Sequence, residues 1–207
     1  GGEGRGAVLD VNHQTQGEDL VSAITAEFGS ISVLINNAGV TEDNLLLRMK
    51  KSQWDNVVNT NLNAIFLLTK ICLKGMTKQR FGRIINISSV VGEMGNAGQT
   101  NYAATKAGVA GFARSLAKEV GSRGITVNTV CPGSTRTERI KELIANQAEK
   151  SGKSLKEAEK LMANNIPMKR IGEPEELASL IAYLASERAS YLTGCALQVD
   201  GGATRGY

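Results

Sequence analysis

The sequence has 207 residues, of which 42% are hydrophobic and 21% charged, and its formal net charge is +4. This length and composition suit one globular domain with a sizeable core. No apolar run approaches the ~18 residues that a membrane-spanning helix needs, so we expect no membrane partner. The small positive charge does not indicate a nucleic-acid partner.

The hydrophobic pattern predicts strands that alternate with helices along the chain. We expect strands at residues 7–11, 33–35, 83–88, 125–130 and 196–199. We expect helices at 18–28, 52–78, 99–120 and 137–150, and one more that starts after Ser154. Because the strands are mostly unbroken apolar runs, the pattern favours a parallel sheet with helices on both faces. The predicted fold class is therefore α/β, with a doubly wound parallel sheet.

Two of these helices begin with capping signals, since Ser52 is followed by Asp55 and Ser154 by Glu157. The apolar side chains expected to face the core are Leu20, Ile24 and Phe28 in the first helix and Val57, Val58, Leu62, Phe66 and Leu67 in the second. Residues 134–172 interrupt the alternation of strands and helices. Two interpretations of this segment stay open, a solvated helical excursion and a mobile lid over the strand ends.

The cysteine and histidine content limits the chemistry. Cys72, Cys131 and Cys195 are odd in number, widely spaced and embedded in apolar segments. They indicate buried, reduced thiols in a cytoplasmic protein, and neither disulfides nor a metal site. The single histidine, His13, excludes a site built from several histidines and disfavours a Ser/His/Asp triad. We therefore expect no bound metal.

The candidate reactive groups lie between residues 89 and 106. Tyr102 and Lys106 are four residues apart, which places them on one face of a helix. A nearby cation lowers the pKa of a tyrosine, which would suit Tyr102 to proton transfer near neutral pH. Ser89 follows an apolar run and should lie at the carboxyl end of a strand, where open α/β sheets bind ligands. Alone, a lysine stem that covers an aromatic ring is the simpler interpretation of the Tyr102–Lys106 pair.

Five motifs in one order change that interpretation: Asn-Asn-Ala-Gly at 36–39, Asn61, Ser89, Tyr102 with Lys106, and Pro-Gly at 132–133. Together they resemble the short-chain dehydrogenase/reductase family, whose fold is Rossmann-like. The resemblance runs from residue 7 to the C-terminus. Residues 44–50, 90–96 and 122–128 are most similar to the 3-oxoacyl-acyl-carrier-protein reductases of that family.

The resemblance implies a role for each of four residues. Tyr102 would protonate a carbonyl oxygen that receives a hydride, and Ser89 would hydrogen-bond and polarise the same oxygen. Lys106 would lower the pKa of Tyr102 and bind the nicotinamide ribose. Asn61 would hold a water molecule that relays protons to Lys106, although a locally bonded helix residue is the alternative.

The resemblance also implies a dinucleotide cofactor, NADP (NADPH) in preference to NAD. Asn37 would lie beside the ribose, and Gly39 would give the backbone room for it. Asp10 and Val11 would contact the adenine at the end of their strand. Thr135 would bond the carboxamide side of the nicotinamide. Asp10 and Thr135 could also be ordinary turn residues.

One departure from the family concerns the N-terminus. The family begins with a strand, a Gly-rich turn that holds the pyrophosphate, a helix and a second strand, and this sequence has no equivalent. We expect the sequence to be part of a longer protein. In these 207 residues alone, the first predicted strand, 7–11, would lack a neighbour, and a dinucleotide would bind poorly.

The implied partner is the thioester of an acyl carrier protein, and the implied assembly is a homotetramer. Arg80 and Arg123 match basic positions that dock the acidic carrier, although each could be a plain surface charge. The 134–172 segment is longer than in typical members of the subfamily. This length leaves open a dehydrogenase of small alcohols, sugars or steroids. The missing nucleotide-binding half leaves open a truncated, non-catalytic paralogue that only oligomerises.

Overall fold

The computed structural model describes residues 3–204, which contain one parallel sheet with the strand order β1-β2-β3-β4. The strands are β1 (Val33–Asn36), β2 (Gly82–Ile87), β3 (Ile125–Pro132) and β4 (Ala196–Val199). Leu34 pairs with Ile84, and Ile84 pairs with Val127, so the central strands are in register over their apolar residues. The predicted α/β class and parallel sheet are confirmed.

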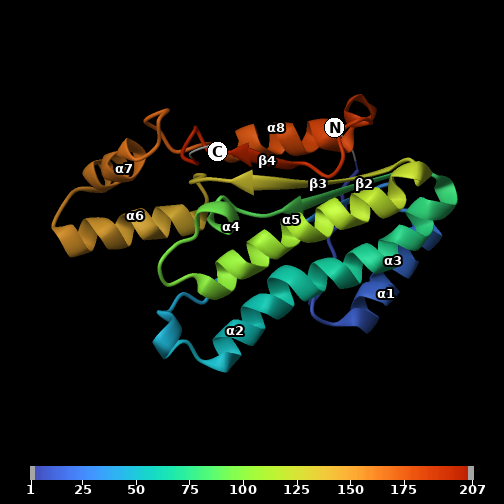
Figure 1. The fold of residues 1–207 in the computed structure, drawn as a ribbon, viewed down its shortest axis with the longest axis horizontal. Helices are drawn as coiled ribbons and strands as arrows, with labels where there is room; N and C mark the ends of the chain where they lie inside the picture. The colour runs from blue at the N-terminus through green and yellow to red at the C-terminus, as the bar shows by residue number, and fades with distance from the viewer. Residues whose placement is uncertain (1–2, 205–207) are drawn as a thin grey trace.

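Helices cover both faces of this sheet (Figure 1). The helices are α1 (Gln14–Phe28), α2 (Lys51–Val58), α3 (Ala64–Gln79), α4 (Val91–Met94), α5 (Thr100–Val120), α6 (Glu138–Ser151), α7 (Leu155–Asn164) and α8 (Pro174–Ala185). Helices α3 and α5 lie side by side on one face with α1 beside α3, and α8 covers the other face. Helices α6 and α7 project beyond the carboxyl ends of the strands. No helix in the described part of the chain is long and apolar enough to cross a membrane.

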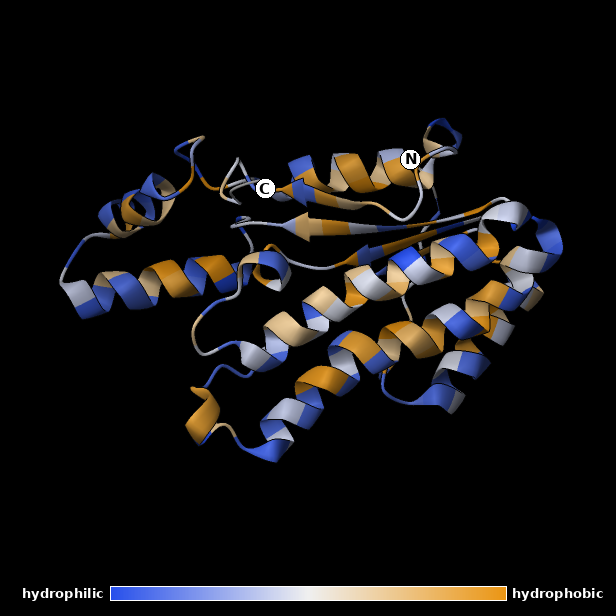
Figure 2. Cartoon of the chain, viewed as in Figure 1, coloured by the Kyte–Doolittle hydropathy of each residue, from blue (hydrophilic) through white to orange (hydrophobic). Residues whose placement is uncertain are grey.

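Successive side chains of each strand point to opposite faces of the sheet, so each strand contributes to two cores. Ile84 points to the core beneath α3 and α5, which includes Met76 and Leu116. Its neighbour Ile85 points to the opposite core, which is closed by Leu184 of α8. The pattern did not predict α8, yet α8 covers β2 and β3 on this second face, whereas Ile35 of β1 is 46% exposed. Figure 2 shows its hydrophobic residues beside those of β4.

The long helix expected at 52–78 is continuous but contains three segments. A five-residue π-helical segment, η2 (Asn59–Asn63), joins α2 to α3. The capping box expected at Ser52 is wrong, because the helix begins at Lys51 and the Gln53 side chain accepts the Lys50 N–H at 2.9 Å. The second expected box is confirmed, since Ser154 and Glu157 cap α7 reciprocally.

Three burial predictions are wrong. Phe28 is 59% exposed and Phe66 is 49% exposed. Each ring lies against a cation instead, Phe28 under the Arg5 guanidinium and Phe66 under the Lys70 ammonium. Val21 takes the core position in α1 that Phe28 was expected to share. Cys195 is half-buried, whereas the other two cysteines are buried as expected, and all three are free thiols.

The strand predicted at 7–11 is also wrong. These residues form no regular structure and Val8 is fully exposed. A strand needs a neighbour to satisfy its backbone N–H and C=O groups, and the described residues offer it none. Asp10 instead begins a turn, where its carboxylate accepts the N–H of Asn12 at 3.0 Å.

Candidate active site

Ser89, Tyr102 and Lys106 meet at the carboxyl edge of the sheet. Strand β2 ends just before Ser89, and the first two turns of α5 carry Tyr102 and Lys106. The Ser89 side chain lies close enough to the Tyr102 hydroxyl to lower its pKa. Lys106 Nζ lies 5.5 Å from the centre of the Tyr102 ring and donates to the Ile87 carbonyl at 2.8 Å. A phenol, a hydroxyl and an amine therefore face one point at the edge of the sheet.

The electrostatics of this cluster differ from the sequence-based expectation. Burial lowers the pKa of Lys106 to about 8. Burial also raises the pKa of Tyr102 above its ordinary value, while the Arg139 cation and the Ser89 hydroxyl lower it and the Asp43 carboxylate raises it. The prediction that Lys106 brings Tyr102 toward neutral pH is therefore wrong for this structure. Arg139 is a second cation near the phenol, and its charge lowers the pKa of Tyr102.

Asn61 lies in η2 and is completely buried. Its side chain accepts the Val40 N–H at 2.8 Å and donates to the Val40 carbonyl at 2.9 Å, so it holds the loop after β1 against the long helix. It also donates to Thr105 Oγ1 at 3.4 Å. These hydrogen bonds join residues far apart in the sequence, so Asn61 is not a locally bonded helix residue. Single-turn π segments often occur at functional sites, and a water relay through Asn61 stays a prediction.

Gly39 lies in the same loop, where space is short. A Cβ at this position would come within 3.3 Å of Asn61 Oδ1 and 3.6 Å of Lys106 Nζ. The neighbouring Asn36 is buried and bonds Thr69 and Asn86, whereas Asn37 is exposed. Of the two adjacent asparagines, the first therefore holds the sheet and the second is free to meet a ligand.

The other expected cofactor contacts are more scattered. Asp10 and Val11 lie in a turn and not at a strand end, so the geometric basis for an adenine contact is absent. That turn does reach the long helix, because Asn12 Nδ2 donates to Thr60 Oγ1 at 3.3 Å. Thr135 is buried just after β3, where it forms a bridge with Gly172.

A cleft of about 500 Å³ opens at this edge between the 134–172 segment and the end of β4. Thr135, Arg170 and Asp200 are among its lining residues. The segment has a small core of its own, made by residues such as Ile144, Ala158 and Ile171. The segment projects past the strand ends, which agrees both with a solvated helical excursion and with a lid.

Two residues that position the catalytic helix were missed by the sequence analysis. Asn101 is completely buried; its Oδ1 accepts the Tyr102 N–H at 2.8 Å, and its Nδ2 donates to the Glu42 carbonyl at 3.0 Å. Gly92 in α4 packs so closely on α5 that a Cβ would lie 2.8 Å from the Ala107 nitrogen. Asn101 is adjacent to Tyr102 in the sequence, but no pattern reveals which backbone groups it contacts.

Arg80 and Arg123 lie at the opposite edge of the sheet. Arg80 ends α3 in the left-handed conformation (φ 55°), just before β2, and Arg123 lies just before β3. Arg80 donates to the Ser122 carbonyl at 2.9 Å, so the two arginines are close to each other. The length of β2 separates them from Ser89, and they cannot belong to the cluster formed by their own chain.

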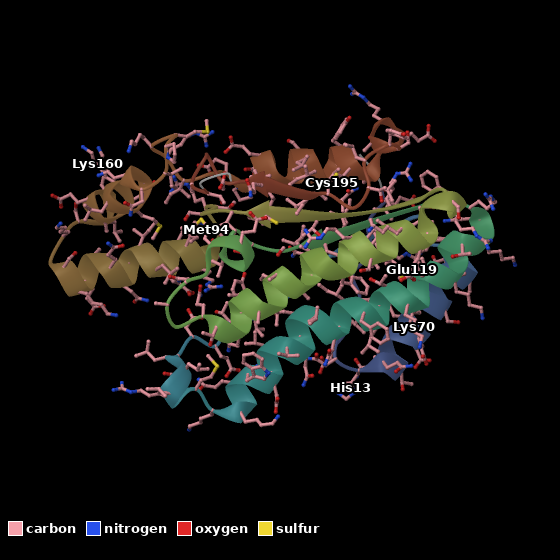
Figure 3. The ribbon with its side chains drawn as sticks, in the orientation of Figure 1. His13, Lys70, Met94, Glu119, Lys160 and Cys195 are labelled. Carbon is pink, nitrogen blue, oxygen red and sulfur yellow. The ribbon has the colours of Figure 1, made fainter. Side chains whose placement is uncertain are left out.

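Metal ligands are not grouped in the structure. Residues 3–204 contain no cluster of three or more His, Cys, Asp or Glu side chains that could hold a metal ion. Figure 3 shows His13 near the start of α1, whereas Met94 of α4 lies at the edge where α6 begins.

Comparisons with known proteins agree over almost the whole chain. A family model described as "Enoyl-(Acyl carrier protein) reductase" matches residues 2–204. The 3-oxoacyl-(acyl-carrier-protein) reductase FabG of Vibrio cholerae is 50% identical over 202 residues, which cover 98% of this chain and 78% of that protein. The proteins of the same name from Pseudomonas aeruginosa and Escherichia coli K12 are 50% and 46% identical, again over 98% of this chain, with 77% and 78% of their own lengths covered.

Proposed function

The chain belongs to the short-chain dehydrogenase/reductase family, and we propose that it reduces the 3-oxo group of an acyl-carrier-protein thioester to a 3-hydroxy group in fatty acid synthesis. The convergence of Ser89, Tyr102 and Lys106 at the carboxyl edge carries this proposal. The naming of relatives that are 50% identical supports the substrate class. It is thus an oxidoreductase with a nicotinamide cofactor.

The side chains of the cluster suit the reduction of a ketone. A carbonyl oxygen between Ser89 and Tyr102 would receive one hydrogen bond from each hydroxyl, which stabilises the charge that develops on it. Tyr102 would then donate its proton to that oxygen. A phenol whose pKa is raised by burial remains protonated at neutral pH and is ready to act as the acid.

The structure fits the nicotinamide half of the cofactor. Because Gly39 has no side chain, its loop can lie close to the buried Lys106 amine, which a Cβ would approach to 3.6 Å. That amine is suited to bind ribose hydroxyls. Lys106, Asn37 and Thr135 would hold this half, and the bound nicotinamide supplies the hydride. We propose NADPH in preference to NADH, because the subfamily that the sequence resembles uses NADPH.

We further propose a homotetramer in the cytoplasm, and one domain in which residues 134–172 act as the lid. If Arg80 and Arg123 dock the acidic carrier, their position at the amino edge requires the thioester to enter the site of another subunit. A docking role for these arginines is therefore linked to oligomerisation.

The test uses the purified full-length protein with NADPH and acetoacetyl-acyl carrier protein. Crotonyl-acyl carrier protein tests the enoyl reduction that the family model's description names. Secondary alcohols, sugars and steroids with NADP⁺ test the other dehydrogenase activities. Reduction of the acetoacetyl substrate alone is expected. Faster turnover of any other substrate, or no turnover of any of these substrates, would refute the assignment.

A further inference from the structure

Arg139 brings a positive charge from outside the sheet to the reacting phenol. It lies in the first turn of α6, and its guanidinium carbon is 5.9 Å from the centre of the Tyr102 ring. Its Nη2 is 3.8 Å from Asp43 Oδ2, in the loop between β1 and α2. The side chains of Arg139 and Asp43 are each about half exposed. Three elements that are distant in the sequence thus meet around one hydroxyl.

The charged groups that face Tyr102 are few. Lys106 faces it from the same helix, Arg139 from α6 and Asp43 from the loop after β1. Ser89, which follows β2, adds an uncharged hydroxyl group. The Lys106 amine is held by the Ile87 carbonyl. The distance between the Arg139 and Asp43 charges can instead change with the position of α6.

Helix α6 is not fixed by the main cores. Its apolar residues Ile144 and Ala148 pack only within the 134–172 segment, against α7 and Ile171. The ion pair between Arg139 and Asp43 is therefore a contact that joins α6 to the loop after β1.

We propose that Arg139 and Asp43 are positioning residues that act on Tyr102 in opposite directions, and that they couple the placement of α6 to proton transfer. Arg139 favours the phenolate, and Asp43 favours the phenol. When α6 approaches, the Arg139 cation stabilises the phenolate that remains after Tyr102 gives up its proton. When α6 moves away, Asp43 acts alone and proton release becomes harder. The catalytic part of this inference rests on the proposed reductase function, but the effect on the titration of Tyr102 does not.

The test is a direct titration that needs no substrate. Tyrosines are labelled with ¹³C at the ring carbon that bears the hydroxyl and followed by NMR against pH in the full-length protein. Tyr102→Phe identifies the signal, and circular dichroism confirms folding at each pH. Arg139→Gln should raise the pKa of Tyr102 by about half a pH unit or more, and Asp43→Asn should lower it by a similar amount. Arg139→Lys should restore part of the effect.

The matched control is Lys141→Gln. Lys141 is a cation on the same helix whose ion pair is with Glu138, so its removal should leave the titration of Tyr102 unchanged. Equal shifts for Arg139→Gln and Lys141→Gln, or shifts of the same sign for Arg139→Gln and Asp43→Asn, would overturn the proposal.

The same variants are then assayed for reduction of acetoacetyl-acyl carrier protein. The high-pH limb of kcat should move with the NMR titration, upward for Arg139→Gln and downward for Asp43→Asn. Opposite NMR shifts without any reduction would support the charge pair and refute the reductase function. Reduction without NMR shifts would support the function and refute the pair.

Discussion

Replacing Lys106 with methionine should make the protein more stable at neutral pH, although Lys106 lies at the centre of the active site. Its side chain is 4% exposed and carries a charge into the core. Burial lowers the pKa of Lys106 from 10.5 to about 8, which costs the native state about 3 kcal/mol. Methionine fills a similar volume without a charge. Its one loss is the hydrogen bond to the Ile87 carbonyl, which costs about 1–3 kcal/mol.

The sign of the effect depends on pH. Below pH 8 the amine is protonated in both the folded and the unfolded states, so the native state bears the whole penalty. Between pH 8 and 10.5 the unfolded state binds the proton more tightly, and the contribution of Lys106 to stability rises with pH. Above that range the penalty has gone and the hydrogen bond remains. Lys106→Met should therefore be more stable than the wild type by about 0–2 kcal/mol at pH 7 and less stable at pH 10.

Urea unfolding of the wild type and Lys106→Met at pH 7 and pH 10 measures this difference. The pKa values of Cys72 and Cys131 are raised to about 11 by burial, so both thiols lower the stability of the native state above pH 9. The effect of Cys72 cancels in the comparison because both proteins contain it. Lys106 lowers the pKa of Cys131, so both proteins also carry Cys131→Ala. A stability difference that is the same at both pH values would refute the reasoning, since it would mean that the buried amine bears no charge penalty.

Three further predictions concern α5 and its contacts, and one of them includes a control substitution at Gly111. Tyr102→Phe should abolish turnover while NADPH affinity stays within a few-fold, because only the transferred proton is lost; near-normal turnover would disprove its role as the acid. Gly92→Ala should destabilise the protein by about 1–3 kcal/mol, because its methyl group would meet the Ala107 backbone. Gly111→Ala, which meets nothing within 4 Å, should stabilise α5 by about 0.5–1 kcal/mol in the same thermal unfolding assay. Asn101→Ala should lower kcat several-fold with little change in NADPH affinity; an equal loss of both would indicate general unfolding of the site.

The sequence allowed the sheet and the placement of the reactive side chains to be predicted because both depend on local order. An apolar run gives a strand, and a spacing of four gives one helical face, so the sequence predicts that Ser89, Tyr102 and Lys106 lie together. The capping box at Ser154 is equally local. The strand predicted at residues 7–11 failed for the opposite reason, since a strand exists only with a partner.

The electrostatics of the site could not be predicted in this way. Lys106 was expected to set the pKa of Tyr102 because it is four residues away, but proximity in sequence does not show where an amine points. The amine bonds the Ile87 carbonyl, and a second cation near the phenol comes from Arg139, 37 residues downstream of Tyr102 in sequence number. Burial, which decides the direction of both pKa shifts, is likewise a property of the assembled fold.

This separation between placement and electrostatics bears on specificity. The side chains that would polarise the carbonyl and donate the proton follow β2 and lie on α5, and both elements are fixed by the cores of the sheet. The charge that adjusts them is carried by α6, which packs within its own small cluster. A change in the 134–172 segment can therefore alter which substrate is admitted and how readily Tyr102 releases its proton, without disturbing the sheet. If so, exchanging this segment between relatives should move the pH dependence of reduction together with substrate preference, while the unfolding transition of the main core stays in place.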